Sequence, residues 1–302
     1  MQVWILRPLG WSGEPTPSDF LLVGCFVAVF FALRFLLDKF VFYPLSVWLV
    51  HKKPVSSKFK LPEATRATIE KCSESLWKLL YYATVECCAL YVIYDEPWFR
   101  DIIKSIDGWP NHELRTSLMI LYMCQCGFYA YSIVALIVWE TRRKDFAVMM
   151  SHHIITSALI SLSYLSRFYR IGAIILALHD ASDVFMELAK IFKYAGKELG
   201  ASISFGLFAI SWLILRLIFF PFWIIKACSF ELPKHLGRSS FSPFWIYYSF
   251  NTMLLMLLVF HIYWWLLICS MIRRQLKNRG RVGEDIRSGT FLTHIVLNCL
   301  KC

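Results

Sequence analysis

Long apolar runs separated by short polar segments dominate the chain. Residues 116–139 contain no Asp, Glu, Lys or Arg, and the same holds for residues 146–166 and 239–272. A helix needs about 20 such residues to cross a hydrocarbon core of roughly 30 Å. The runs therefore predict membrane-spanning helices and a polytopic membrane protein.

The pattern predicts an all-α fold with about seven transmembrane helices. We expect the first at 20–37, with an extension towards residue 48, and the others at 76–94, 116–139, 147–166, 171–192, 199–225 and 243–272. The span at 171–192 is unusual because it carries His179, Asp180, Asp183, Glu187 and Lys190. Ionisable groups inside a membrane are costly and mark function by default.

Composition agrees with a membrane protein and narrows its partners. Apolar residues make up 58% of the chain and charged residues 18%, with a net charge of +11. The positive charge lies in short loops and in the tail, not on a basic helix interleaved with aromatic residues. We therefore expect the lipid bilayer as a partner and no nucleic acid. Most of the cysteines lie in apolar runs, where they act as small hydrophobic residues.

The positive charges also predict orientation and domain boundaries. Loops on one side carry 18 Lys and Arg residues, and those on the other side carry nine. Positive residues favour the cytosol, so the N-terminus is expected in the lumen and the C-terminus in the cytosol. We expect a lumenal N-terminus, first anchor and cytosolic loop at 1–74, a helical domain at 75–273, and a basic cytosolic tail at 274–302.

Candidate chemistry gathers on the fourth and fifth spans, which form a tight hairpin. His152 and His153 lie one to two turns inside the cytosolic end of the fourth span. His179, Asp183 and Glu187 follow at four-residue steps on one face of the fifth, with Asp180 about 100° away. At 1.5 Å per residue, His152 lies about 8 Å and Asp183 about 12 Å below the cytosolic boundary. The two groups are therefore expected to meet.

Such a cluster has three interpretations. An imidazole can exchange a proton near neutral pH, with a carboxylate fixing its tautomer, or can attack an activated acyl group directly. Polar residues can also act only as packing contacts between helices. A zinc site could use His152, His153, His179 and Asp183, but adjacent histidines point about 100° apart on a helix. We expect no metal, and we expect the isolated His261 to serve packing only.

The same residues carry a family resemblance. The sequence reads Arg-Lys-Asp-Phe at 143–146, His-His-x-x-Thr at 152–156, Ser-Tyr at 163–164, Arg-x-Gly at 170–172 and His-Asp-x-x-Asp at 179–183. This pattern, with Glu187 and Lys190, resembles the longevity-assurance motif of the ceramide synthases, which are TLC-domain membrane proteins. The motif covers 140–193 and the wider resemblance about 70–275. It implies that the last six helices form a TLC-type bundle around a lipid cavity.

The resemblance implies N-acylation of a sphingoid long-chain base by a fatty acyl-CoA in the endoplasmic reticulum membrane, giving (dihydro)ceramide. Acyl-CoA would be a co-substrate, with no other cofactor. Assembly as a homo- or hetero-dimer is compatible with the resemblance. The expected catalytic residues are His152, His153, His179, Asp180 and Asp183. The expected substrate-binding residues are Arg142, Arg143, Lys144 and Tyr164, the three cations lying where CoA phosphates would need them.

Two alternatives and one specificity element remain. The alternatives are a non-enzymatic TLC-domain lipid sensor or transport accessory, and a membrane metallohydrolase. In the resembling family, the loop between the last two spans influences acyl length; here that loop is 226–242. Its flanking aromatics Phe222, Trp223, Phe244 and Trp245 either line the far end of the cavity or form an interfacial belt.

Overall fold

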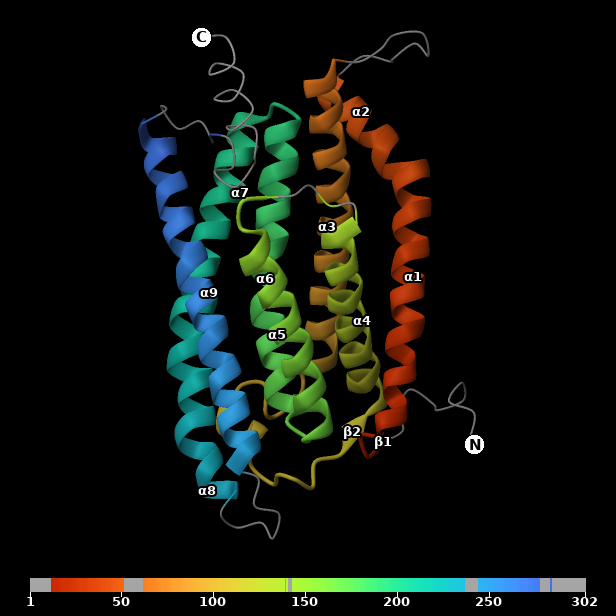
Figure 1. Ribbon diagram of the computed structural model, residues 1–302. Coiled ribbons are helices and arrows are strands. Elements are labelled where there is room, and N and C mark those ends of the chain that lie inside the picture. Colours follow the sequence, from red (N-terminus) through yellow and green to blue (C-terminus); the bar gives the residue numbers. More distant parts are fainter. Residues whose placement is uncertain are drawn as a thin grey trace.

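A computed structural model describes residues 12–51, 62–138, 140, 143–236, 244–277 and 283. Long helices run side by side as an upright bundle (Figure 1). We call the end that holds the turn between α5 and α6 the lower end, as in Figure 1, and the opposite end the upper end. The predicted orientation assigns the upper end to the cytosol.

The N-terminal span is one continuous helical stretch. A short turn η2 (Pro17–Phe20) leads into α1 (Leu21–Leu37), a wider turn η3 (Asp38–Phe42) and α2 (Tyr43–His51). The expected extension towards residue 48 is confirmed. The next helix, α3 (Glu63–Ile93), begins well before residue 76. Its first turns are polar, so apolarity alone placed this boundary too late.

The middle of the bundle consists of α4 (Thr116–Val138), α5 (Phe146–Leu165) and α6 (Tyr169–Tyr194). The expected hairpin of α5 and α6 is confirmed, and it turns at Arg167, whose φ is 63°. Six helical stretches in the described residues are long and apolar enough to cross a membrane. Helix α6 is more polar, yet its 26 residues span about 39 Å, and it packs against α3 and α7. With the six stretches above, α6 brings the number of crossings to seven, and it is the fifth in chain order.

The sixth crossing starts as α7 (Glu198–Ser211) and widens into π-type turns in η5 (Trp212–Ile225) and η6 (Ala227–Glu231), followed by α8 (Leu232–Leu236). Pro221 lies inside η5 and cannot donate a backbone hydrogen bond there. Widened turns such as those of η5 and η6 are frequent at functional sites. The last crossing is α9 (Phe244–Lys277).

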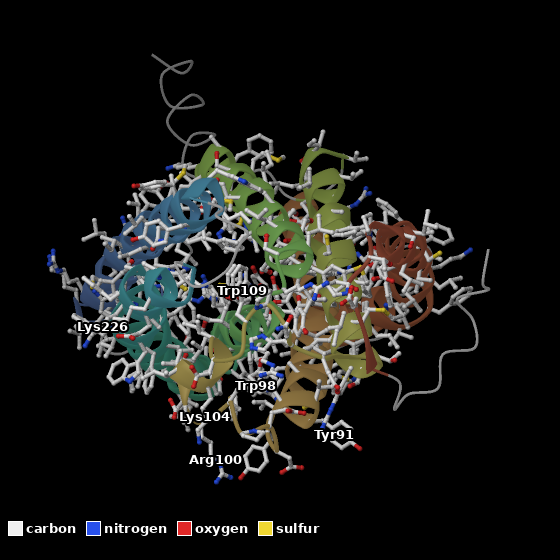
Figure 2. All side chains as sticks on the ribbon, turned by 90° about the horizontal axis from the view of Figure 1, so that it is seen from below. Tyr91, Trp98, Arg100, Lys104, Trp109 and Lys226 are labelled. Carbon is white, nitrogen blue, oxygen red and sulfur yellow. The ribbon has the colours of Figure 1, made fainter. Side chains whose placement is uncertain are left out.

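Loop segments close the lower end. Strands β1 (Ser12–Gly13) and β2 (Leu114–Arg115) pair antiparallel, and the short helix η4 (Ile102–Ser105) lies nearby in the chain. The Trp109 indole donates a hydrogen bond of 2.8 Å to the Ser166 carbonyl. Figure 2 shows Trp109 well inside the outline of the bundle, whereas Arg100 and Lys104 point outward at its edge. The predicted all-α fold is confirmed, with this small strand pair as the sheet of the described residues.

His112 is a buried titratable group of this lower cap. One ring nitrogen, Nε2, donates to the Asp107 carbonyl at 2.7 Å. The other, Nδ1, is buried without a hydrogen-bond partner among the described residues. Burial lowers the pKa of His112 below its ordinary value of 6.5. The folded cap therefore favours the neutral ring.

Candidate active site

Two neighbouring histidines of α5 stand at the centre of the bundle. The ring centroids of His152 and His153 are 5.6 Å apart, and His152 is buried. The His152 ring is nearly perpendicular to the ring of Trp264 from α9, with 5.2 Å between their centroids. The Trp264 indole donates to the Asp145 carboxylate at 3.1 Å, which fixes the wall against which His152 rests.

Two cavities meet at His152. The upper cavity has an empty volume of about 1090 Å³ and is lined by His152, His153, Asp183, Lys190, Lys193 and Arg216, among others. The lower cavity, of about 700 Å³, runs from His152 and His179 to Ile106, Leu232 and Phe250, and most of its lining is apolar. Both cavities also contact Tyr129. His152 and Tyr129 therefore mark the junction between a charged chamber and an apolar one.

Arg216 is the main partner of Asp183. Its guanidinium donates to the Asp183 carboxylate at 2.8 Å and to the His179 carbonyl at 2.6 Å. It also lies over the Trp212 ring, 4.0 Å from the centroid. No role was predicted for Arg216 from the sequence, although it lies within the predicted span 199–225. An arginine inside a membrane helix with a carboxylate at similar depth was the available signal.

His179 is paired with His261 from α9, with 3.0 Å between their Nε2 atoms. The Nδ1 atom of His179 lies 2.6 Å from the Ile175 carbonyl. A carbonyl only accepts, so Nδ1 carries the proton of the neutral ring and Nε2 is bare. His261 therefore donates from Nε2. The expectation that His261 serves packing alone missed this contact.

Asp180 lies behind the histidines in a second polar chain. Gln125 of α4 donates to its carboxylate, and Tyr81 of α3 donates to Gln125 at 3.0 Å. Asp180 is 1% exposed, and it lines neither the upper nor the lower cavity. Its place off the His179–Asp183 face agrees with the helical spacing. Its contacts hold α6 against α3 and α4.

Comparison with known proteins assigns the family. A model of the TLC domain matches residues 71–270. Ceramide synthase LOH2 of Arabidopsis thaliana is 64% identical, over 92% of this chain and 95% of its own length. ASC1-like protein 3 of Oryza sativa subsp. japonica is 57% identical over 91% and 96%. Ceramide synthase 1 LOH3 of Arabidopsis thaliana is 44% identical over 94% and 95%. This chain belongs to the ceramide synthase family of TLC-domain membrane proteins.

The four residues predicted to bind substrate do not form one group in the structure. Arg143 lies 3.4 Å from Glu74 of α3, Lys144 is exposed, and Arg142 lies outside the described residues. The Tyr164 hydroxyl donates to Asp19 at 2.5 Å, at the lower end of α5. Of the three described side chains, none lines the upper cavity, where Lys190, Lys193 and Arg216 supply cations instead.

The contacts of His179 and Asp183 also concern the alternative that this cluster binds zinc. Among the described residues, no three His, Cys, Asp or Glu side chains are grouped so that they could hold a metal ion. His179 is bound to His261, and Asp183 to Arg216. A metal-free reaction stays a prediction, tested below.

Of the two interpretations of the aromatics that flank residues 226–242, the structure favours the interfacial belt. Phe222, Trp223 and Trp245 are 65%, 48% and 61% exposed, and the side chain of Phe244 lies outside the described part. None of the three exposed rings lines the lower cavity. Outward-facing aromatics near span ends are typical of an interfacial belt. Residues 226–242 were predicted to form a loop, but 227–236 are helical (η6 and α8). Cys228 and Leu232 of this helical part contact the cavity instead.

Proposed function

We propose that this chain transfers the acyl group of a fatty acyl-CoA to the amine of a sphingoid base, giving (dihydro)ceramide. The thioester C–S bond breaks, an amide C–N bond forms, the CoA thiol leaves, and the amine gives up a proton. Relatives named ceramide synthase that match nearly the whole chain support this reaction. A non-enzymatic role gives no reason for a buried His and Asp cluster between two cavities.

The junction of the two cavities at His152 is the observation that carries the proposal. A fatty acyl-CoA has an apolar chain and an anionic head. The lower cavity suits the chain, because burial of apolar surface is favourable. The upper cavity suits the head, with Lys193 and Arg216 in its lining and phosphate as a strong partner of such cations. The thioester between them would then lie beside His152.

Two routes use this geometry. In one, a histidine attacks the thioester carbonyl, the CoA thiol leaves, and the amine then displaces the acyl group from the imidazole. In the other, a histidine takes the amine proton while the amine attacks the thioester directly. Incubation with acyl-CoA in the absence of amine separates them. The first route leaves an acyl group on the peptide that contains residues 152–153, detected by mass spectrometry, and the second leaves none.

A direct assay tests the function. Purified full-length protein in lipid nanodiscs receives sphinganine and a panel of acyl-CoAs, and N-acylated products are identified by mass. We expect (dihydro)ceramide from the wild type and about 10²–10⁴-fold slower formation by His152→Ala. A lipid sensor or transport accessory would form no product with any donor.

Localisation and assembly are further proposals. We infer an endoplasmic reticulum membrane location from the resemblance to the ceramide synthases. The distribution of Lys and Arg supports a lumenal N-terminus and a cytosolic C-terminus. We infer that acyl-CoA is the co-substrate and that no other cofactor is needed. We also propose a homodimer or a heterodimer with a related chain. Tags at each terminus, probed in sealed microsomes, test the orientation, and crosslinking in the same membranes tests the dimer.

A further inference from the structure

A third cavity lies beside the two that meet at His152. This side cavity has an empty volume of about 630 Å³ and lies between α3, α4, α5 and α6. It shares His153 with the upper cavity but contacts neither His152 nor Asp183. The two α5 histidines therefore differ in surroundings: His152 faces the apolar lower cavity, and His153 faces the side cavity.

Among the described residues, each cation that lines the side cavity is already bound to a carboxylate. Lys78 lies 2.9 Å from both Glu74 and Glu140. Arg143 lies 3.4 Å from Glu74, and Lys190 lies 2.6 Å from Glu187. The Asp145 carboxylate is a further acidic group of the lining. In the part of the chain that the structure describes, the lining thus holds the three carboxylates Glu140, Asp145 and Glu187 against three cations, so it has no excess positive charge to attract an anion.

One carboxylate oxygen of Glu187 has no hydrogen-bond donor among the described residues. Its side chain is 1% exposed, and Lys190 occupies Oε1 only. The second oxygen, Oε2, is buried with no hydrogen-bond partner among the described residues. A buried carboxylate oxygen without a donor costs free energy, and an N–H donor would recover it.

Glu187 and His153 line the same cavity from adjacent helices. Counted from the turn that joins α5 and α6, His153 lies 12 residues before the end of α5 and Glu187 lies 18 residues after the start of α6, so Glu187 is about 9 Å nearer the upper end. The Nδ1 atom of His153 is likewise buried without a partner in the described part of the chain. An acceptor and an imidazole therefore line one cavity, with the acceptor on its upper side.

We propose that the side cavity receives the ammonium group of the amine substrate, with Glu187 Oε2 as its acceptor and His153 in the wall of the same cavity. This assignment rests on the proposed function, since it places the second substrate of that reaction. Acyl-CoA would occupy the upper and lower cavities, whose charged lining has three cations and one carboxylate that Arg216 already binds. The two substrates would then approach the histidine pair from different sides.

The experiment compares two ligands that differ in charge. Tritiated sphinganine is bound to the full-length protein in nanodiscs without acyl-CoA and is displaced by unlabelled sphinganine or by octadecane-1,3-diol, which lacks the amine. We expect Glu187→Gln to weaken sphinganine binding about tenfold, a change of about 1.4 kcal/mol, and to leave the affinity for the diol unchanged. In turnover, the KM for sphinganine should rise while the KM for acyl-CoA stays within about twofold of its original value.

Glu86→Gln is the matched control. Glu86 also lies in a membrane helix with a buried carboxylate oxygen that has no partner in the described residues, but it lines none of the three cavities. It should change neither affinity. If Glu187→Gln does not fold, the same binding comparison is made with Glu187→Asp, which keeps the negative charge and shortens the reach of the carboxylate.

Three results overturn the assignment: an unchanged affinity for sphinganine, an equal loss for both ligands, or an effect on the KM for acyl-CoA alone. Failure of the proposed function looks different. A wild type that prefers sphinganine over the diol, yet forms no N-acylated product, would retain the ammonium site and lose the reaction.

Discussion

The Nε2 atom of His261 lies 3.0 Å from the Nε2 atom of His179, across 82 positions of the chain. The ring of His261 is fully buried, and its backbone carbonyl accepts the Trp212 indole at 3.3 Å. Since His179 holds its own proton on Nδ1 against Ile175, His261 must supply the shared one. This contact fixes both tautomers and ties α9 to the motif on α6.

His261 should therefore act as a positioning residue for His179. We expect His261→Leu to lower kcat/KM about tenfold or more, because a buried acceptor on His179 is left without a donor. His261→Gln, whose amide can still donate, should recover most of that loss. Equal activity of the two variants, at equal thermal stability, would reduce His261 to a packing role.

The two α5 histidines carry the second prediction. Replacing His152 or His153 with Ala should lower acyl transfer by about 10²–10⁴-fold, the usual contribution of a positioned acid–base group. Insertion should be unaffected, as judged by yield and by size-exclusion behaviour in detergent. Full activity in either variant, with normal insertion, would move the reaction centre elsewhere.

The span pattern and the motif hairpin could be predicted from the sequence, because bilayer thickness and helical spacing fix them locally. The cavities and the contact between His179 and His261 could not. Both depend on which faces of α6 and α9 meet, and the sequence does not show which residue a lone histidine in an apolar span will contact. The role of Arg216 could have been inferred, since a charged side chain within a span needs a partner of opposite charge.

The acidic residues carry the third prediction, that they support the histidines without a metal. Asp180→Asn and Asp183→Asn should each lower activity, because Asp180 binds Gln125 and Asp183 binds Arg216. Strong chelators such as EDTA and 1,10-phenanthroline should leave the wild type fully active in detergent. A zinc-dependent enzyme treated in parallel confirms that chelation worked. Reproducible loss that zinc restores would revive the metallohydrolase alternative.

His112 predicts a pH dependence of stability at the lower end. Its pKa is lowered by burial, so the unfolded chain binds a proton more readily than the folded one, below about pH 6.5. The stabilisation is present above that pH and is lost as the pH falls towards the folded pKa. Unfolding rates at one temperature, followed by circular dichroism from pH 7.5 to 5.5, should rise more steeply for the wild type than for His112→Gln. Parallel profiles would show that His112 does not contribute.

The last prediction concerns acyl-chain length, which the far end of the lower cavity should measure. That end is formed by Ile106, Leu232 and Phe250, from three separate segments of the lower half. A chain that enters at His152 reaches these residues only if it is long enough. Each buried methylene contributes about 0.8 kcal/mol, so two extra carbons that fit should favour a longer donor by about tenfold.

Phe250→Ala should shift the products towards longer acyl chains, because it removes a ring from the end of the cavity. Exchange of residues 226–242 for the loop of a relative with another chain preference should also shift them, through Cys228 and Leu232. Trp223→Ala is the control, since Trp223 is 48% exposed and lies outside the cavity. Products from an equimolar acyl-CoA mixture, resolved by mass, give the profile. If Phe250→Ala is active and correctly inserted but keeps the original profile, chain length is selected elsewhere, and the 226–242 exchange then shows whether the loop acts without the cavity.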